Sequence, residues 1–475
     1  MTEKLKNILC IYPYKKELSS AGFMPPIGLE SIARTASEFS EKIKIVDMRF
    51  ENGNLSRFMN PLPDAVLISV NWYYEKKKVK ELIRSIPPGI LTIVGGREAT
   101  ETTETLLQEC PNIDIIVRGE GEKTIREILQ NTPLHEIKGI SYNCDGKVIH
   151  NPMRGMDDLS HFYKIGRNLR DYKYQFKISG INFGYTVDGV FSSRGCPYNC
   201  KFCTFNFTPD GEKIKWRGRE PEDVVEEIKE IDADFIIFLD ENFTHDVKRV
   251  ERICDLIIEQ KIKKVFVSNA RIEIYRHPEV LAKMEKAGFR FLTLGIESSQ
   301  DHVLKQMRKG FTTDDLRKGF AVLRKFNIFS HAYFIIGSPN ETKEEMLNIA
   351  GFAREVGIGS IGVSNLRCAP TSPMYAEIKG LRGYHIDKKE RVYSDKYSVS
   401  DIKEIRKTIY GKFYTASTLW KIFAFFVSNG LLTPKLLFNV ARTSINPFVL
   451  GRQNKKKNDV KKARKILKQQ SKINK

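Results

Sequence analysis

The sequence lacks several features that would each assign it to a common class. It has 8 cysteines in 475 residues, too few for a disulfide-stapled secreted scaffold. No window offers the roughly 18 uninterrupted apolar residues of a membrane-spanning helix. Residues 1–7 are polar and lack the apolar core of a signal peptide. We therefore expect a cytoplasmic protein of several domains, at most peripheral to a membrane.

Acidic residues are scarce at the C-terminal end. The net charge is +20, and half of it lies in residues 452–475, where eleven Lys or Arg accompany one acid, Asp459. Such a tail is usually a solvated end, and its functional alternative is attraction to an anionic membrane surface. Because the rest of the chain is only mildly basic, we expect no specific nucleic-acid partner.

Three of the cysteines are concentrated in one loop. Cys196, Cys200 and Cys203 follow the apolar run Val187–Phe191 with the spacing C-x3-C-x2-C. Three thiolates in this arrangement suit a 4Fe–4S cluster and leave one iron without a protein ligand. A zinc site usually has a fourth protein ligand, and no CxxC or HxxxH partner follows. Three buried structural cysteines are the alternative, but they would not need to share one loop.

Residues 1–135 alternate apolar strands with helical patterns, which predicts a doubly wound parallel sheet of the α/β class. Ligands of such sheets bind at the carboxyl ends of the strands, where Asp47, Ser69 and Gly95-Gly96 stand. The expected strands are Ile8–Tyr12, Lys44–Asp47, Ala65–Ser69, Leu91–Val94 and Ile113–Val117, with a helix at Ile27–Phe39.

Residues 136–185 read as a linker region, and residues 186–395 as six strand–helix units. Six such units predict a partial (βα)6 TIM-like barrel with its chemistry at the carboxyl ends of the strands. A helical C-terminal region, 396–451, and the basic tail, 452–475, complete the chain. The expected barrel strands are Val187–Phe191, Phe235–Leu239, Lys264–Ser268, Phe291–Ile296, Ser330–Ile336 and Ser360–Asn365.

The cysteine loop resembles that of the radical S-adenosylmethionine (SAM) superfamily, including the aromatic Phe202 before the last cysteine. The resemblance implies that the open iron chelates the amino and carboxylate groups of SAM. It also implies reductive cleavage of SAM to a 5′-deoxyadenosyl radical, which takes hydrogen from an unreactive C–H bond.

The strand ends after this loop resemble the SAM-binding motifs of the same family. Asp240-Glu241 stand at the ammonium motif, Glu297 lies in a ribose-type motif, and Gly337 opens a Gly-x-Pro-x-Glu-Thr turn. The resemblance implies a SAM site made of Phe202, Asp240, Glu241, Asn269, Arg271, Glu297 and Gly337. The sequence assigns no residue to the substrate chemistry itself.

The first 135 residues resemble the cobalamin-binding domain that precedes many radical SAM modules. The matching places are Asp47, Ser69, Gly95-Gly96 and the run Gly119–Glu122. In the classical Asp-x-His-x-x-Gly motif the histidine ligates cobalt, and here Arg49 takes that position. The resemblance implies cobalamin without a histidine ligand from this motif. A vestigial domain that binds nothing is the alternative.

The segment Trp420–Phe438 is rich in large apolar residues. It reads either as the core of a capping helical domain or as an interfacial segment that the basic tail would assist at a membrane surface. Over nearly its full length the chain resembles the cobalamin-dependent radical SAM group of anaerobic Mg-protoporphyrin monomethyl ester cyclases and hopanoid- and lipid-modifying enzymes. Their substrates are large and apolar.

We therefore expect a radical SAM enzyme that uses a 4Fe–4S cluster, SAM and cobalamin on an unactivated C–H bond of an apolar or lipid-like substrate. Methyl transfer and oxidative cyclisation or C–C bond formation are both open, and an electron donor of the ferredoxin or flavodoxin type is implied. A methylthiotransferase would carry a second cysteine triad, but Cys10, Cys110 and Cys144 are widely spaced. A non-catalytic iron–sulfur protein that binds RNA or membranes would leave the SAM-like strand ends unexplained.

Overall fold

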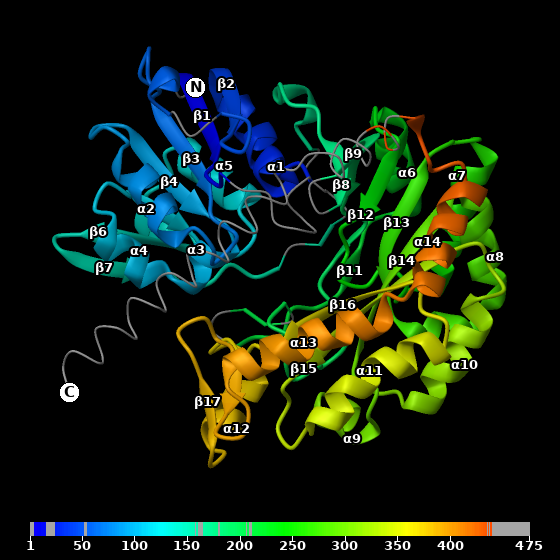
Figure 1. Cartoon of the computed structure of the whole chain (residues 1–475). Coiled ribbons are helices and arrows are strands. Elements are labelled where there is room, and N and C mark those ends of the chain that lie inside the picture. The colour runs from blue at the N-terminus through cyan, green and yellow to red at the C-terminus, as the bar shows by residue number, and fades with distance from the viewer. Residues whose placement is uncertain are drawn as a thin grey trace.

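The structure is a computed structural model of the chain. It describes residues 4–15, 24–51, 55–156, 158–159, 165–178, 181–205, 207–208, 211–434, 436 and 438. Two α/β units face each other, an N-terminal unit and a larger curved sheet covered by helices on its outer side (Figure 1). The basic tail, 452–475, lies outside the described residues.

The N-terminal unit is the expected doubly wound sheet. Its strand order is β2-β1-β3-β4-β5-β6-β7, and the pairs among β1 to β5 are parallel. The parallel strands are β1 (Leu5–Tyr12), β2 (Ser40–Asp47), β3 (Ala65–Ser69), β4 (Leu91–Gly95) and β5 (Ile115–Val117). The helices are α1 (Ile27–Ala36), α2 (Lys76–Arg84), α3 (Arg97–Glu101), α4 (Thr103–Glu109) and α5 (Glu122–Leu129).

The region expected as a linker is partly folded into both sheets. A hairpin of β6 (Ile140–Cys144) and β7 (Lys147–His150) extends the N-terminal sheet antiparallel to β5. Its turn, Asp145-Gly146, has positive φ at both residues, 49° and 77°, which is the geometry that Asp-Gly favours in two-residue hairpins. Farther on, β8 (Gln175–Ile178) pairs antiparallel with the first barrel strand.

The second unit is the expected partial barrel. Six parallel strands follow the order β16-β15-β14-β13-β12-β9, with β8 added at the edge. They are β9 (Ile181–Val190), β12 (Phe235–Phe238), β13 (Val265–Ala270), β14 (Phe289–Glu297), β15 (Phe329–Ile336) and β16 (Ser360–Asn365). The covering helices are α6 (Pro221–Glu230), α7 (Val247–Glu259), α8 (Pro278–Ala287), α9 (Asp301–Gln306), α10 (Thr313–Leu323) and α11 (Lys343–Glu355).

The described part of the C-terminal region, through α13 (Val399–Phe413) and α14 (Ala416–Ser428), packs on the barrel. In α13, a buried apolar face joins the barrel core beside α11 and β16. In α14, Phe425 and Phe426 contact the inner aromatic residues of the barrel strands. No helix among the described residues is long and apolar enough to cross a membrane. The remaining short elements are β10 (Ser193–Arg194), β11 (Arg217–Gly218), α12 (Pro373–Lys379), β17 (Tyr384–Ile386) and β18 (Val392–Ser394).

Candidate active site

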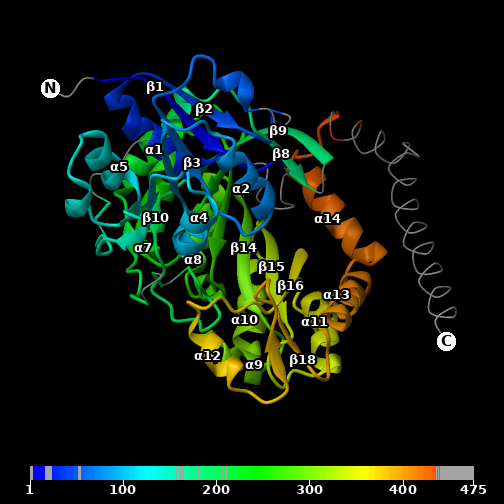
Figure 2. The ribbon, with the colours of Figure 1, turned by 90° about the vertical axis from the view of Figure 1, so that its left-hand side faces the viewer.

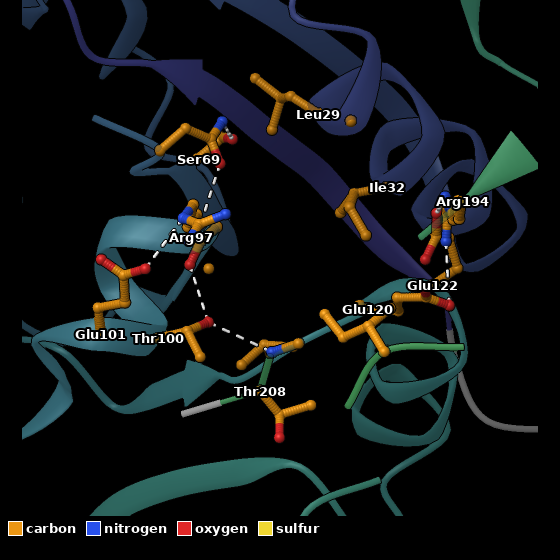
Figure 3. Close-up of a pocket in the computed structure, with 18 of the residues that line it drawn as sticks. Leu29, Ile32, Ser69, Arg97, Thr100, Glu101, Glu120, Glu122, Arg194 and Thr208 are labelled. Carbon is orange, nitrogen blue, oxygen red and sulfur yellow. Dashed lines mark hydrogen bonds and ion pairs between the residues drawn. The ribbon is translucent and has the colours of Figure 1, made fainter. Parts of the chain in front are cut away.

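A cavity of about 430 Å³ lies where the carboxyl ends of the two sheets meet (Figure 3). One wall comes from the N-terminal unit, with apolar side chains of α1 such as Leu29 and Ile32 and glycines of the strand-end loops. The other wall comes from the barrel and includes Gly195 of the cysteine loop, Phe205 just after it, and Glu241. A ligand in this cavity therefore touches both units.

The cysteine loop is held in place from two sides. The buried carboxylate of Asp240, directly after β12, accepts hydrogen bonds from the backbone N–H of Ser192 at 2.8 Å and of Ser193 at 2.5 Å. On the other side, the carbonyl of Lys201 accepts from Ser372 Oγ at 2.7 Å and from the N–H at the start of α12. Asp240 therefore fixes the loop at whose far end the thiols lie.

The three thiols lie close enough to interact electrostatically. Burial raises the pKa of the Cys203 thiol to about 11, and the charges of Cys200 and Cys196 raise this pKa too. Three thiolates at one place therefore need cations, which irons would supply. Within the described ranges, no three His, Cys, Asp or Glu side chains converge on the position of one metal ion.

A cation stands beside the loop. Arg271 places Nη1 3.8 Å from Cys200 Sγ, and its guanidinium lies 3.7 Å from the ring centre of Tyr198. Its Nη2 donates to Glu273 at 2.7 Å. In the structure, Arg271 therefore contacts a thiol of the loop, the site where a cluster would bind.

The other expected SAM residues are spread around the barrel rim. Glu241 lines the cavity and accepts from Gly195 N at 3.1 Å, while Asn269 Nδ2 donates to the carbonyl of Asp240 at 2.9 Å. Glu297 is buried and paired with Lys309 at 3.3 Å. Farther round the rim, Gly337 has φ +88° and donates to Glu341 at 2.8 Å. Phe202 packs with a smaller apolar cluster around Met307 and Ile335.

Of the residues expected to hold cobalamin, Ser69, Gly95 and Gly96 line the cavity, and Asp47 does not. The buried Asp47 carboxylate is instead paired with Arg49 at 2.6 Å and accepts from Tyr174 Oη at 2.8 Å. The Arg49 side chain also lies over the rings of Tyr12 and Tyr174. Arg49, at the histidine position of the classical motif, is thus engaged away from the cavity.

Sequence reasoning missed the cations that join the two walls. Arg194, in the cysteine loop, pairs with Glu122 at 2.6 Å, and Arg217 pairs with Glu120 at 2.5 Å. The guanidinium of Arg97 lies 4.1 Å from the ring centre of Phe205. The run Gly119–Glu122 stood out in the sequence, but nothing there indicates that its acids face cations about 70 to 100 residues later. Figure 3 shows the Arg194–Glu122 pair at the cavity edge.

Comparisons with known proteins match both units. A radical SAM superfamily model matches residues 190–353, and a B12 binding domain model matches residues 18–129. An uncharacterized methyltransferase of Pyrococcus horikoshii is 30% identical over 376 residues, covering 75% of this chain and 79% of that protein. The anaerobic magnesium-protoporphyrin IX monomethyl ester cyclase of Rubrivivax gelatinosus is 29% identical over 297 residues, covering 59% of this chain and 52% of the cyclase. The chain thus spans about half the length of that cyclase.

Solved structures share the same two-part fold. The radical SAM methyltransferase TsrM from Kitasatospora setae, solved with cobalamin and a [4Fe-4S] cluster, superposes with a TM-score of 0.68 at 15% identity, covering 86% of this chain and 89% of TsrM. The cobalamin-dependent SAM radical enzyme OxsB gives a TM-score of 0.64 at 18% identity, covering 86% and 66%. At these identities the likeness concerns the fold.

Proposed function

This chain belongs to the cobalamin-dependent radical SAM enzymes, and from that premise we propose that it transfers a methyl group to an unactivated carbon of a large apolar substrate. Its cofactors are a 4Fe–4S cluster, SAM and cobalamin. When bound, the cluster supplies the electron that cleaves SAM, and cobalamin supplies a methyl carrier. The protein's own part is to bind, orient and exclude water.

The observation that carries this proposal is the shared cavity. Gly95 and Gly96 line it from the N-terminal unit, and Gly195 and Glu241 line it from the barrel. A methyl carrier and a nucleoside radical must both reach one carbon, and one cavity between two cofactor loops brings them together. Apolar side chains of α1, β3, β4 and β5 contribute to the wall, which suits an apolar ligand.

The residues divide into three groups in this proposal. Cys196, Cys200 and Cys203 hold the cluster, and Arg271 neutralises part of its charge. Glu241, Asn269, Glu297 and Gly337 contact SAM, while Asp240 positions the loop. Ser69, Gly95 and Gly96 give cobalamin close access to the backbone, because none of them presents a bulky side chain to the cavity.

Oxidative cyclisation is the second candidate, and the similarity to the cyclase of Rubrivivax gelatinosus favours it. Both reactions need a substrate and a one-electron donor, for which we propose a protein of the ferredoxin or flavodoxin type. For an apolar substrate we also propose that the enzyme works at a membrane surface, because α14 exposes apolar side chains, including Trp420 at 68%.

Anaerobic reconstitution with iron, sulfide and cobalamin, followed by mass spectrometry after addition of SAM and a reductant, tests the proposal. Methyl transfer should give 5′-deoxyadenosine and S-adenosylhomocysteine together in the presence of extracted apolar metabolites. Formation of 5′-deoxyadenosine without S-adenosylhomocysteine would favour oxidative cyclisation over methyl transfer. The Cys200→Ala variant is the control and should give neither product above background.

A further inference from the structure

The concave face of the barrel sheet carries polar side chains that neither proposed cofactor site uses. Along β15 the odd-numbered residues from Phe329 to Ile335 face this side, because Ala332, Phe334 and Ile336 belong to the core beneath the outer helices. The strand therefore presents Phe329, His331, Tyr333 and Ile335 in sequence from its amino end toward the cluster loop, where Ile335 shares an apolar cluster with Phe202.

Four phenylalanines form a cluster, here called the aromatic floor, at the amino ends of β14 and β15. They are Phe291, Phe329, Phe425 and Phe426. Phe329 and Phe425 have ring centres 5.1 Å apart, and Phe291 and Phe426 have ring centres 6.0 Å apart. Two of these rings come from barrel strands and two from α14, so the floor spans the amino ends of β14 and β15. Such a surface favours contact with a hydrocarbon.

Above the floor lies a polar layer of neutral side chains. His331 is in register with Thr293 on β14 and with Ser360 on β16, and Asn269 is in register with Thr293. Ser360 Oγ lies 2.7 Å from His331 Nδ1, which fixes the ring, and the Tyr333 ring stands edge-on at 4.8 Å. These three residues, Thr293, His331 and Ser360, are the polar layer, and Asn269, assigned above to SAM, borders it.

The polar layer offers no free charge to a ligand. Burial lowers the pKa of His331 to about 4, so this imidazole is neutral near pH 7. On the rim, Glu297 is paired with Lys309 at 3.3 Å and Arg271 with Glu273 at 2.7 Å. A carboxylate or phosphate placed here would be desolvated without a counter-charge, which is strongly unfavourable.

Tyr333 stands next to the strand end that resembles the ribose motif. Gly295 pairs with Tyr333 in register on one side, and Gly362 pairs with it on the other. A Cβ on Gly362 would lie 2.6 Å from Tyr333 Cδ1, so the glycine lets the phenol ring lie across β16. Tyr333 is 41% exposed although it lies on the inner face. Because neighbouring strands are only about 4.8 Å apart, it lies close to the strand end that resembles the ribose motif.

We propose that His331 and Tyr333 hydrogen-bond an uncharged polar group, a hydroxyl or a carbonyl, of a substrate whose hydrocarbon part rests on the aromatic floor. The inference rests on the proposed function and names its substrate class: apolar alcohols or ketones in preference to acids and phosphates. A neutral imidazole and a phenol can each donate or accept, so both forms of polar group are accommodated.

Equilibrium dialysis of the reconstituted holoenzyme with tritiated farnesol tests this directly. Farnesane, which lacks the hydroxyl, and farnesoic acid, which is ionised at pH 7.5, serve as competitors. Wild type should bind farnesol saturably and at least tenfold more tightly than farnesoic acid. His331→Phe and Tyr333→Phe should each weaken farnesol binding about fivefold, the loss expected for one hydrogen bond, without changing the affinity for farnesane.

His385→Phe is the matched control, since His385 lies on β17 and pairs with the exposed Asp395. Ser360→Ala removes the hydrogen bond that orients His331 and should act in the same direction as His331→Phe if the latter variant folds poorly. Absence of saturable farnesol binding, tighter binding of farnesoic acid, or unchanged farnesol affinity in both site variants would overturn the inference. Detection of S-adenosylhomocysteine is independent of this result, so the two proposals can fail separately.

Discussion

Among single residues, Arg271 shows how far a strand-end motif can be interpreted from sequence. The pattern places it at the barrel mouth, where it stands, but its contact with Cys200 Sγ depends on the path of a loop 71 residues earlier. Hydrogen bonds and positive charge near the sulfurs raise the reduction potential of an iron–sulfur cluster, because they stabilise the more negative reduced form. Arg271 is therefore expected to set how easily the cluster accepts its electron.

Replacing Arg271 with Gln should make the cluster potential more negative. A charge-assisted hydrogen bond of typical strength corresponds to roughly 60 mV or more for a one-electron couple. A redox titration followed by electron paramagnetic resonance measures the shift. Arg276→Gln removes the same charge from a nearby exposed side chain, and equal shifts in the two variants would show that the contact with Cys200 has no special effect.

Glu341 makes stability depend on pH. Burial raises the pKa of this carboxyl from 4.5 to about 7. Between these values the folded protein binds more protons than the unfolded chain, so the free energy of unfolding should fall as pH rises from about 4.5 to about 7, by on the order of 3 kcal/mol. Glu341→Gln should flatten that part of the profile in denaturant titrations at pH 5, 6, 7 and 8. The exposed Glu344→Gln should leave the slope unchanged, and a Glu341→Gln profile as steep as wild type would contradict the assignment.

At the scale of elements, runs of apolar residues located nearly every strand of both sheets. The expected strands at Ala65–Ser69 and Ser360–Asn365 match β3 and β16 residue for residue. The strands β6 and β7 within the region 136–185 are not predicted by alternation, because their apolar and polar residues alternate weakly, and the informative signal is the Asp145-Gly146 turn. The sequence predicted that Ser69, Gly95 and Gly96 stand at strand ends, and these three residues line the cavity, whereas Asp47, also at a strand end, does not. The pairs across the cavity, Arg194 with Glu122 and Arg217 with Glu120, could not be predicted, since they depend on how the two units meet.

The loop after β4 permits a direct test of the cobalamin side of the cavity. Gly96 has φ +102°, and a Cβ there would lie 2.5 Å from Asn71 Oδ1 and 2.8 Å from the carbonyl of Val70. Gly96→Ala must move this loop and should reduce cobalamin affinity at least tenfold, as measured by absorbance after reconstitution. Gly89→Ala is matched, because Gly89 also has positive φ, +84°, but a Cβ there meets nothing within 4 Å. Equal cobalamin retention in the two variants would contradict the assignment of Gly96 to the cobalamin site.

Over the whole molecule, the two faces of α14 differ. One face supplies Phe425 and Phe426 to the barrel, while Leu419, Trp420, Phe423 and Val427 are exposed by 54%, 68%, 44% and 51%. In Figure 2 the helix lies at the edge of the molecule. An exposed apolar stripe with a tryptophan suits the interfacial region of a bilayer.

Association with anionic vesicles should follow from this stripe. Trp420 emission should shift to the blue with phosphatidylglycerol vesicles, and Trp420→Ser with Phe423→Ser should weaken co-sedimentation at least tenfold. Deleting residues 452–475 should make binding weaker and less sensitive to salt, because exposed charges are screened within about 8 Å at physiological ionic strength. Leu134→Ser, an exposed apolar residue of the N-terminal unit, is the control. Unchanged sedimentation of the α14 variant would contradict membrane association through this helix.

The position of α14 in the chain also determines when the aromatic floor can be completed during synthesis. The strands that carry Phe291 and Phe329 leave the ribosome well before residues 416–428. Until then the aromatic floor has only half of its rings, and the inner face of the barrel is uncovered at the amino ends of β14 and β15. A nascent chain therefore passes through a stage in which both cofactor loops have been synthesised but α14 does not yet complete the aromatic floor. Pausing at this stage would expose the barrel aromatics to chaperones, and loading of the cofactors is best deferred until α14 has docked.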